Sequence, residues 1–425
     1  MELTVPSDLP ALLRRIDDAV EYEDHTGALQ LILNNWYDLP DPAPLRERVA
    51  LLLATEGRKR EAVEIYELVA RHYANAGFPT RALAAIKQMY ALNPSSTQLL
   101  DQFTTLYSVR SPFLERGLRQ APIPEPPGSL KLEVNDSTDL DTLFEWAIER
   151  ARDAEVVADR PGSLPALPLL SLLPPKALRR VLDFLEYEIY AESQPLLGDQ
   201  TSEDDLFWAV SSDLVVQQQD EAYRIPAGTL LGLGQFRERK ACSDYSVLSK
   251  KGSECLRLSR DAFDKLTDEF PDFPNRLAAL YRHALTERLF ARHPIFADLD
   301  EQARLELSSE LMGLRLEADT ALLQQDKVSP GLYVLLDGSV EVKRQSGSIE
   351  IALDTLGPGE IIGEVGLVDP RPAIVTAATA EPVHLLFFSR EDFADFSRRH
   401  PVVAQRVQQR ADRRIEEVRK TVPDS

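Results

Sequence analysis

The strongest constraint on how this chain folds is an internal repeat. Sliding residues 166 onward along themselves by 126 to 131 positions brings apolar residues, glycines and prolines into coincidence. Coinciding residues include Pro168 with Pro294, Leu206 with Leu332, Phe207 with Tyr333, Gly232 with Gly363, Ser259 with Ser389, Arg260 with Arg390 and Pro271 with Pro401. Because the shift drifts so little, the sequence predicts two copies of one domain, over residues 165–290 and 291–425.

Each copy has a helical start, then short alternating strands, then a helical end. In the second copy, residues 331–360 alternate apolar and polar side chains, and Asp337, Gly338 and Gly347 interrupt them with hairpin-type turns. Short strands at even spacing indicate a small β-barrel or jelly roll. Residues 401–421 form a predicted helix, which carries an apolar stripe made of Val403, Val407, Ala411, Ile415 and Val418.

Residues 1–118 show apolar spacing typical of helices joined by short turns. Eight positions resemble one tetratricopeptide repeat: Tyr66, Val69, Ala70, Tyr73, Gly77, Ala82, Ile86 and Pro94. We therefore predict a tetratricopeptide-like helical domain that docks a protein partner, with a plain helical bundle as the alternative. The complete fold class is α+β and multidomain.

Residues 119–164 are the predicted linker. Four prolines between residues 122 and 127 favour an extended chain, and a short helix follows. The face of this helix formed by Leu143, Trp146 and Ala147 is expected to pack on the next domain.

Composition excludes several classes of protein. A formal net charge of −21 argues against nucleic-acid binding. No apolar run approaches the roughly 20 residues of a membrane helix, and the N-terminus lacks a signal-peptide pattern, so we expect a cytoplasmic protein without a membrane partner. Two cysteines, Cys242 and Cys255, and six dispersed histidines predict neither a metal site nor a disulfide framework. No catalytic constellation is visible, so we expect no enzyme activity.

Residues 359–380, GEIIGEVGLVDPRPAIVTAATA, suit a small charged ligand. Gly363 and Gly366 allow the backbone to approach a ligand, Glu364 offers a carboxylate to sugar hydroxyls, and Arg371 offers a planar fork to a phosphate. The alternative for Glu364 and Arg371 is an ion pair on a surface loop.

Helix, jelly roll, Gly-Glu and Pro-Arg in one loop, then helices: this order resembles the cyclic nucleotide-binding domain family. The resemblance covers nearly all of residues 294–400 and, in eroded form, about 168–270. Together the copies resemble the tandem arrangement of protein kinase A regulatory subunits, although many bacterial proteins carry such domains. The resemblance implies that residues 359–377 are a phosphate-binding cassette.

By this resemblance, Glu364 accepts a hydrogen bond from the ribose 2′-OH, and Arg371 pairs with the cyclic phosphate. Backbone groups near Gly366 and Leu367 complete the cradle. The full predicted ligand set is Gly363, Glu364, Val365, Gly366, Leu367, Arg371, Pro372 and Ala373. Pro372 departs from the Ala, Ser or Thr usual in the family, which lowers the expected affinity, argues against cGMP and favours cAMP.

The first copy departs further from the family. Leu233 stands where the carboxylate should be, and Lys240 stands where the arginine should be. We expect a structural copy that binds no nucleotide; the alternative is another anion held by Arg237, Arg239 and Lys240.

These expectations combine into a receptor for a cyclic nucleotide that signals to an unidentified protein through the N-terminal helical domain. The terminal helix would close over the base as a lid, although its apolar stripe also suits a homodimer contact. A scaffold whose jelly rolls no longer bind nucleotide is the alternative function.

Overall fold

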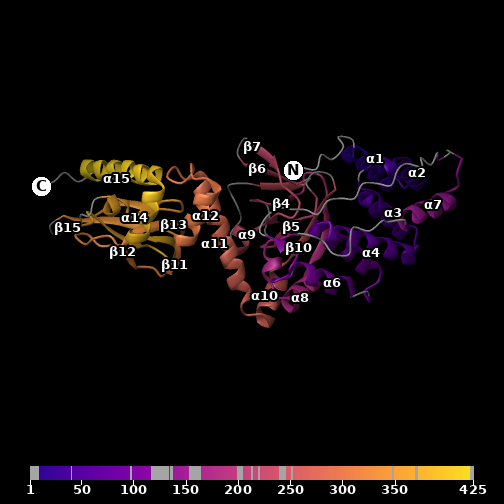
Figure 1. Cartoon of the computed structure of the whole chain (residues 1–425), viewed down its shortest axis with the longest axis horizontal. Helices are drawn as coiled ribbons and strands as arrows, with labels where there is room; N and C mark the ends of the chain where they lie inside the picture. Colours follow the sequence, from indigo (N-terminus) through magenta and orange to yellow (C-terminus); the bar gives the residue numbers. More distant parts are fainter. Residues whose placement is uncertain are drawn as a thin grey trace. The chain divides into compact units, whose positions relative to one another are not determined.

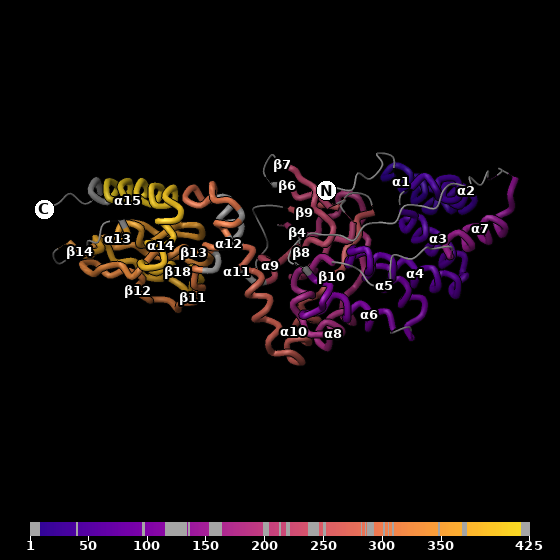
Figure 2. The backbone as a smooth tube through the Cα atoms, in the orientation of Figure 1, coloured from indigo at the N-terminus to yellow at the C-terminus, as the bar shows by residue number. Residues whose placement is uncertain are grey.

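The computed structural model describes residues 9–39, 41–95, 98–115, 134, 137–152, 164–198, 204–211, 214–218, 221–238, 246–249, 252–346, 349–368 and 372–421. The chain divides into two compact units, Met1–Ala278 and Ala279–Ser425. The elements are labelled in Figure 1, and Figure 2 follows the backbone in the same orientation. The division into four segments ending at residues 118, 164, 290 and 425 stays a prediction.

The first unit begins with helices, as predicted. They are α1 (Leu9–Glu21), α2 (His25–Asn35), the 3-10 turn η1 (Trp36–Asp38), α3 (Ala43–Thr55), α4 (Lys59–Asn75), α5 (Pro79–Leu92) and α6 (Gln98–Tyr107). Gly57 and Gly77 follow α3 and α4 with φ of 77° and 83°, a left-handed conformation that glycine adopts without a Cβ penalty. The residue after each glycine donates its N–H to a carbonyl five residues earlier, which closes both helix ends. Whether these helices are tetratricopeptide repeats stays a prediction.

Helix α7 (Leu140–Arg152) corrects one expectation. It packs on α2, α3 and α4, so the face predicted to pack on the next domain lies against the N-terminal helices, as Figure 2 shows. Strand β1 (Leu114–Glu115), which precedes this excursion, pairs in parallel with β2 (Leu164–Pro165), which follows it. The proline-rich residues 119–133 lie outside the described part of the chain.

The first jelly roll follows within the same unit. Its helical elements are η2 (Leu170–Leu172), α8 (Pro175–Phe184), α9 (Leu233–Glu238), α10 (Arg260–Glu269) and the start of α11 (Phe273–Arg292). Its strands are β3 (Glu186–Tyr190), β4 (Pro195–Leu197), β5 (Leu206–Ala209), β6 (Leu214–Gln218), β7 (Glu221–Arg224), β8 (Leu230–Leu231), β9 (Ser246–Ser249) and β10 (Ser253–Leu258). They form two antiparallel sheets, ordered β3-β10-β5-β8 and β4-β9-β6-β7.

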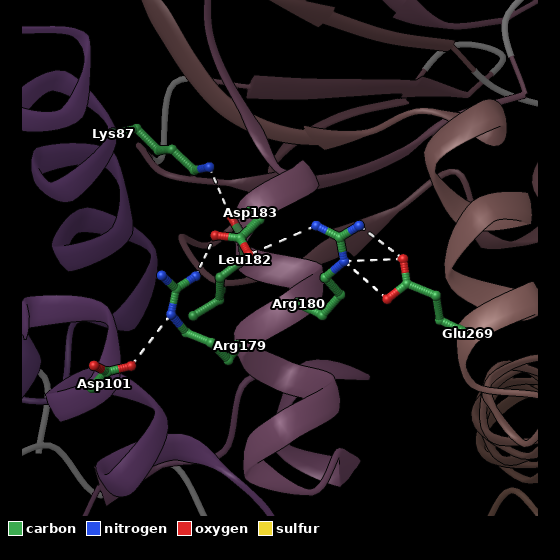
Figure 3. Close-up of polar contacts among 7 residues, drawn as sticks. All are labelled: Lys87, Asp101, Arg179, Arg180, Leu182, Asp183 and Glu269. Carbon is green, nitrogen blue, oxygen red and sulfur yellow. Dashed lines mark hydrogen bonds and ion pairs between the residues drawn. The ribbon is translucent and has the colours of Figure 1, made fainter. Parts of the chain in front are cut away.

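The N-terminal helices and the first jelly roll are joined by direct packing. Helix α5 contacts β3 and β10, and α6 contacts α8. Figure 3 shows the polar contacts around α8, in which Lys87 and Asp101 belong to the N-terminal helices and Arg179, Arg180, Leu182, Asp183 and Glu269 to the first jelly roll. Lys87 Nζ donates to the carbonyl of Leu182 at 2.6 Å, and Arg179 bridges Asp101 on α6 and Asp183 on its own helix. Helix α8 therefore ties the helical part to the jelly roll.

The second unit repeats the jelly roll. Its helices are α12 (Glu301–Glu310), α13 (Glu364–Val368), α14 (Arg390–Arg399) and α15 (Pro401–Thr421). Its strands are β11 (Met312–Leu316), β12 (Ala321–Leu323), β13 (Gly331–Asp337), β14 (Val340–Ser346), β15 (Ile349–Leu356), β16 (Ile361–Ile362), β17 (Thr376–Thr379) and β18 (Val383–Ser389). The sheets are ordered β11-β18-β13-β16 and β12-β17-β14-β15, strand for strand the order of the first copy. The predicted pair of repeated jelly rolls is confirmed.

Helix α15 is buried along its own unit. Val403 and Val407 belong to one core with Phe296, Phe388 and Phe396, and Ala411 is also buried. Ile415 is half-buried, and Val418 lies among residues whose side chains are not described. The first three residues of the stripe that suggested a homodimer are therefore covered inside the unit that carries it, and the homodimer stays a prediction. Among the described residues, no helix is long and apolar enough to cross a membrane.

Candidate functional site

The second jelly roll contains a cavity between its sheet β12-β17-β14-β15 and helix α13. The cavity holds about 570 Å³ of space free of protein atoms, part of it open to solvent. Strand residues Leu323, Val342, Leu356 and Ala377 give it apolar walls. Its polar groups are few, and Glu364 is the carboxylate among its lining residues. Such a site suits a ligand with an apolar face and a small number of polar groups.

Two glycines shape the end of the cavity where α13 begins. Gly363 has φ of +95°, and a Cβ built on it would lie 2.3 Å from the carbonyl oxygen of Gly331. A Cβ on Gly366 would lie 2.7 Å from the Cβ of Ser329. The sequence needs glycine at both positions because the cassette backbone runs directly against the turn that precedes β13.

Ser329 fixes that turn from inside. Its hydroxyl donates to the carbonyl of Gly331 at 2.7 Å, and its own carbonyl accepts from Arg390 Nη2 at 3.0 Å. Ser329 also lines the cavity. Sequence patterns alone indicated no role in the site for Ser329 or Arg390. A serine before Pro330 and Gly331, at the start of a strand, was the available signal.

Glu364 is the first residue of α13, and its side chain is 2% exposed. Burial raises the pKa of this carboxyl above its ordinary value, and the charge of Arg414 opposes the rise. The carboxylate is thus held in a position where water stabilises it poorly. A ligand hydroxyl that donates to Glu364 would replace part of the missing hydration.

Arg414 reaches the cavity from α15. Its Nη1 donates to the carbonyl of Ile361 at 2.8 Å and lies 3.5 Å from Glu364 Oε1, and its Nη2 lies 3.9 Å from Asp354 Oδ2 on β15. One turn earlier in the helix, Arg410 pairs with Glu360. The terminal helix therefore contacts both sides of the cavity through charged side chains. The sequence indicated a role for the apolar stripe of α15 but none for the arginines beside it.

The predicted site residues are only partly brought together. Gly363, Glu364, Val365, Gly366 and Ala373 line the cavity. Leu367 packs against the core on the other side of α13, and Pro372 is exposed. Arg371 lies outside the described residues. The role of this set in binding stays a prediction.

The first copy keeps the backbone frame of the cassette but not its side chains. A Cβ on Gly232 would lie 2.4 Å from the carbonyl of Asp205, the counterpart of the contact between Gly363 and Gly331. Leu233 opens α9 as Glu364 opens α13, and Gln235, only 5% exposed, takes the place of Gly366. Arg239 and Lys240 and the side chain of Arg237 are not described, so the alternative anion site stays a prediction.

Comparisons with known proteins agree with the resemblance found in the sequence. Residues 314–400 match the model of the family described as "Cyclic nucleotide-binding domain". This range contains the cassette and all the residues that line the cavity except Arg414, which belongs to α15. The resemblance of the second copy to that family is confirmed.

Three curated relatives show the extent of the similarity. The cyclic AMP receptor protein of Thermus thermophilus is 34% identical over 97 residues, which cover 23% of this chain and 45% of that protein. The cAMP-dependent protein kinase type II regulatory subunit of Drosophila melanogaster is 26% identical over 117 residues, covering 27% and 31%. The cAMP-dependent protein kinase regulatory subunit of Yarrowia lipolytica is 28% identical over 214 residues, covering 50% and 54%. The chain therefore spans about half, or less, of the length of each.

Solved structures are similar at a lower level. The regulatory domain of Toxoplasma gondii PKA with cAMP has 17% identity and a TM-score of 0.29, covering 58% of this chain and 92% of that chain. The catabolite activator protein of Thermus thermophilus has 31% identity and a TM-score of 0.28, covering 29% and 59%. At these TM-scores the similarity supports no further argument.

Proposed function

We propose that this protein is a non-catalytic receptor for a cyclic nucleotide, with cAMP favoured over cGMP, and that the ligand binds in the second jelly roll. The observation that carries the proposal is Glu364, a carboxylate 2% exposed at the polar end of a cavity whose walls are mostly apolar. The match of residues 314–400 to the cyclic nucleotide-binding family supports it.

In this proposal the ribose 2′-OH donates to Glu364, and the cyclic phosphate lies where the cassette backbone approaches the turn before β13. Arg371 supplies the charge for the phosphate. A hydrogen bond to a charged group contributes about 1.5–3 kcal/mol, and losing an arginine that pairs with a phosphate costs about 2–5 kcal/mol of binding. The base lies along the apolar walls formed by β14 and β15.

The preference for cAMP is argued from the residue after the cassette arginine. Pro372 has neither a hydroxyl for the guanine amino group nor an N–H for the phosphate. Ile374, which lines the cavity, adds another apolar surface. Without a hydroxyl on residue 372, the 2-amino group of guanine, which adenine lacks, loses that partner, and this disfavours cGMP.

The output of the receptor is a change in the protein surface. A ligand that binds Glu364 changes the environment of Arg414, so the ligand and α15 are coupled through one ion pair. The ligand can shift this equilibrium only by its difference in affinity for the two states. We propose that a cytoplasmic protein partner reads the change, with the N-terminal helices as the docking part of the receptor.

Isothermal titration calorimetry of the full chain with cAMP, cGMP and 5′-AMP tests the proposal. We expect saturable heat with cAMP, weaker binding of cGMP, and a loss of affinity of at least 30-fold in Arg371→Ala. No heat with either cyclic nucleotide at millimolar concentration, together with an Arg371→Ala protein that behaves like wild type, would contradict it. The scaffold function would then be the better account.

A further inference from the structure

Helix α7 covers a surface formed by three consecutive N-terminal helices. It contacts α2, α3 and α4, and so does not stack on one neighbour as the next helix of a regular array would. Its buried side chains are Leu143, Phe144, Ala147, Ile148 and Ala151. These positions form one face of the helix, and two of them are alanines that let the backbones approach closely. The intervening Glu145 and Glu149 are exposed.

Charged side chains fix the direction in which α7 lies. Arg152 donates two hydrogen bonds to the carboxylate of Glu64 on α4, at 2.8 and 2.7 Å. Arg150 lies over the ring of Tyr37, 5.1 Å from its centroid. The N-terminal helices contribute a cation in return, because Arg58 lies 5.4 Å from the centroid of Phe144. The surface thus offers an acidic group and aromatic contacts at defined places.

Contacts that do not involve α7 join the chain segments on either side of it. Strands β1 and β2 pair at the base of the excursion, where the N–H of Leu164 donates to the carbonyl of Phe113 at 2.7 Å. The chain segment before α7 and the segment after it are therefore held together directly. Residues 116–133 and 153–163, which connect α7 to these strands, lie outside the described part of the chain. Nothing in the β1–β2 pair requires α7 to stay bound.

We propose that the surface made by α2, α3 and α4 is a helix-binding site, that α7 occupies it in cis, and that a helix of another protein replaces α7. The chemistry of α7 defines this partner. It is an amphipathic helix with apolar residues at i, i+1, i+4, i+5 and i+8, small residues at i+4 and i+8, and arginines at i+7 and i+9 that meet Tyr37 and Glu64. This site does not depend on the proposed nucleotide function.

The first experiment weakens the packing of α7 on its site in the full chain and then adds a separate peptide with the sequence of α7. The variant Phe144→Ser/Ile148→Ser removes two apolar anchors from α7 and leaves the surface unchanged. The matched control is Glu145→Ser/Glu149→Ser, which changes exposed positions of the same helix. The probe is a fluorescent peptide of residues 137–152, which includes the N-cap Asp139, whose side chain accepts the N–H of Thr142 at 3.0 Å.

We expect fluorescence anisotropy to show peptide binding at least tenfold tighter for the weakened variant than for wild type or the control. A peptide with Arg152→Glu should bind at least fivefold more weakly. Equal peptide affinity for the weakened variant and the control would overturn the proposal. A weakened variant that forms dimers in light scattering would also overturn it, because the occupant would then be a second copy of this chain.

A second measurement covers the case in which the weakened variant fails to fold. Hydrogen exchange of the wild-type chain should show the amides of α7 exchanging by an opening that leaves α4 protected. Exchange of α7 and α4 in one cooperative step would show that α7 is a permanent part of the helical core, and the proposal would be wrong.

Discussion

Single residues determine whether the cavity in the second jelly roll exists. Gly363 combines a positive φ with the 2.3 Å approach to the carbonyl of Gly331, so any side chain there must displace backbone. A left-handed non-glycine residue costs on the order of 1–3 kcal/mol, and the clash adds to that cost. The cavity therefore depends on the absence of one methyl group.

We predict that Gly363→Ala lowers the free energy of unfolding of the second unit by at least about 2 kcal/mol and weakens nucleotide binding. The control is Gly357→Ala, because a Cβ at Gly357 meets no atom within 4 Å and its φ is not positive. Denaturant unfolding followed by circular dichroism measures both variants. Equal transition midpoints for the two variants would contradict this account.

His293 predicts a pH dependence of the second unit. Its Nδ1 accepts the N–H of Ile295 at 3.2 Å, and burial together with the charge of Arg410 lowers the pKa of the imidazole to about 4. In the unfolded chain this imidazole binds a proton near its ordinary pKa of about 6.5. The stability that the neutral imidazole contributes is therefore fully present above that pH and is lost as the pH falls towards 4. His293→Asn keeps an acceptor for the same N–H and cannot titrate. Its unfolding midpoint should change less between pH 6.5 and 4.5, and a slope equal to wild type would contradict the assignment.

At the level of whole elements, the two copies share an ion pair with reversed charges. In the first copy Arg180 on α8 pairs with Glu269 on α10 at 2.8 Å, and in the second Glu306 on α12 pairs with Arg399 on α14 at 2.7 Å. The repeat places Arg180 at the position of Glu306 and Glu269 at the position of Arg399. The helix–helix contact is therefore retained while its polarity is exchanged. Exchanging helices between the copies would bring like charges together.

A double-mutant cycle on the first pair tests this contact. Arg180→Glu should destabilise the first unit only slightly, because the pair is about 40% exposed and screened by water. Arg180→Glu/Glu269→Arg should recover most of that loss. Unfolding followed by tryptophan fluorescence measures it. Glu269→Arg completes the cycle, and a double variant whose loss of stability equals the sum of the two single losses would show that the pair contributes no coupling energy.

The elements also show which parts of the fold the sequence could predict. Glycines and prolines at turns keep their positions in both copies, so sliding the sequence found both jelly rolls. The packing of the N-terminal helices on the first jelly roll could not be predicted, because it depends on the outer face of the sheet β3-β10-β5-β8. There, Tyr187 on β3 stands where β11 has Gly313. Periodicity identifies such a face as exposed or buried but does not say which element covers it, and the partner of α7 was mispredicted for the same reason.

Considered as a whole, the molecule consists of two units with separate cores. Its three tryptophans, Trp36, Trp146 and Trp208, all lie in the first unit, whereas the cavity lies in the second. Tryptophan fluorescence therefore reports the first unit, and far-ultraviolet circular dichroism reports both units. A ligand that binds only in the cavity of the second unit should stabilise only the unfolding transition of that unit, which tryptophan fluorescence does not report.

We predict that cAMP at 100 times its Kd raises the free energy of unfolding of the second unit by about 2.7 kcal/mol and leaves the fluorescence transition unchanged. Guanidinium titrations with both signals measure the effect. A shift of the fluorescence transition by the same amount would mean that the first copy also binds the ligand, or that the units unfold together.

The position of the candidate site could be predicted from the sequence, but the contact of the terminal helix with that site could not. Glycine spacing and a lone Glu364 between apolar runs located the cassette, because these residue types are required locally. Arg414 is 50 residues away in the chain and belongs to a helix whose apolar stripe gave no indication of what its charged edge contacts. The pairing of Arg414 with Glu364 follows from tertiary packing alone.

The central claim is that Glu364 holds the ribose of a bound cyclic nucleotide. The most direct test compares the affinities of cAMP and 2′-deoxy-cAMP for the wild-type chain and for Glu364→Gln. Wild type should bind cAMP at least tenfold more tightly than the deoxy ligand, since a charge-assisted hydrogen bond contributes about 1.5–3 kcal/mol. In Glu364→Gln this difference should shrink to threefold or less. Equal affinity of the wild-type chain for the two ligands would contradict the account.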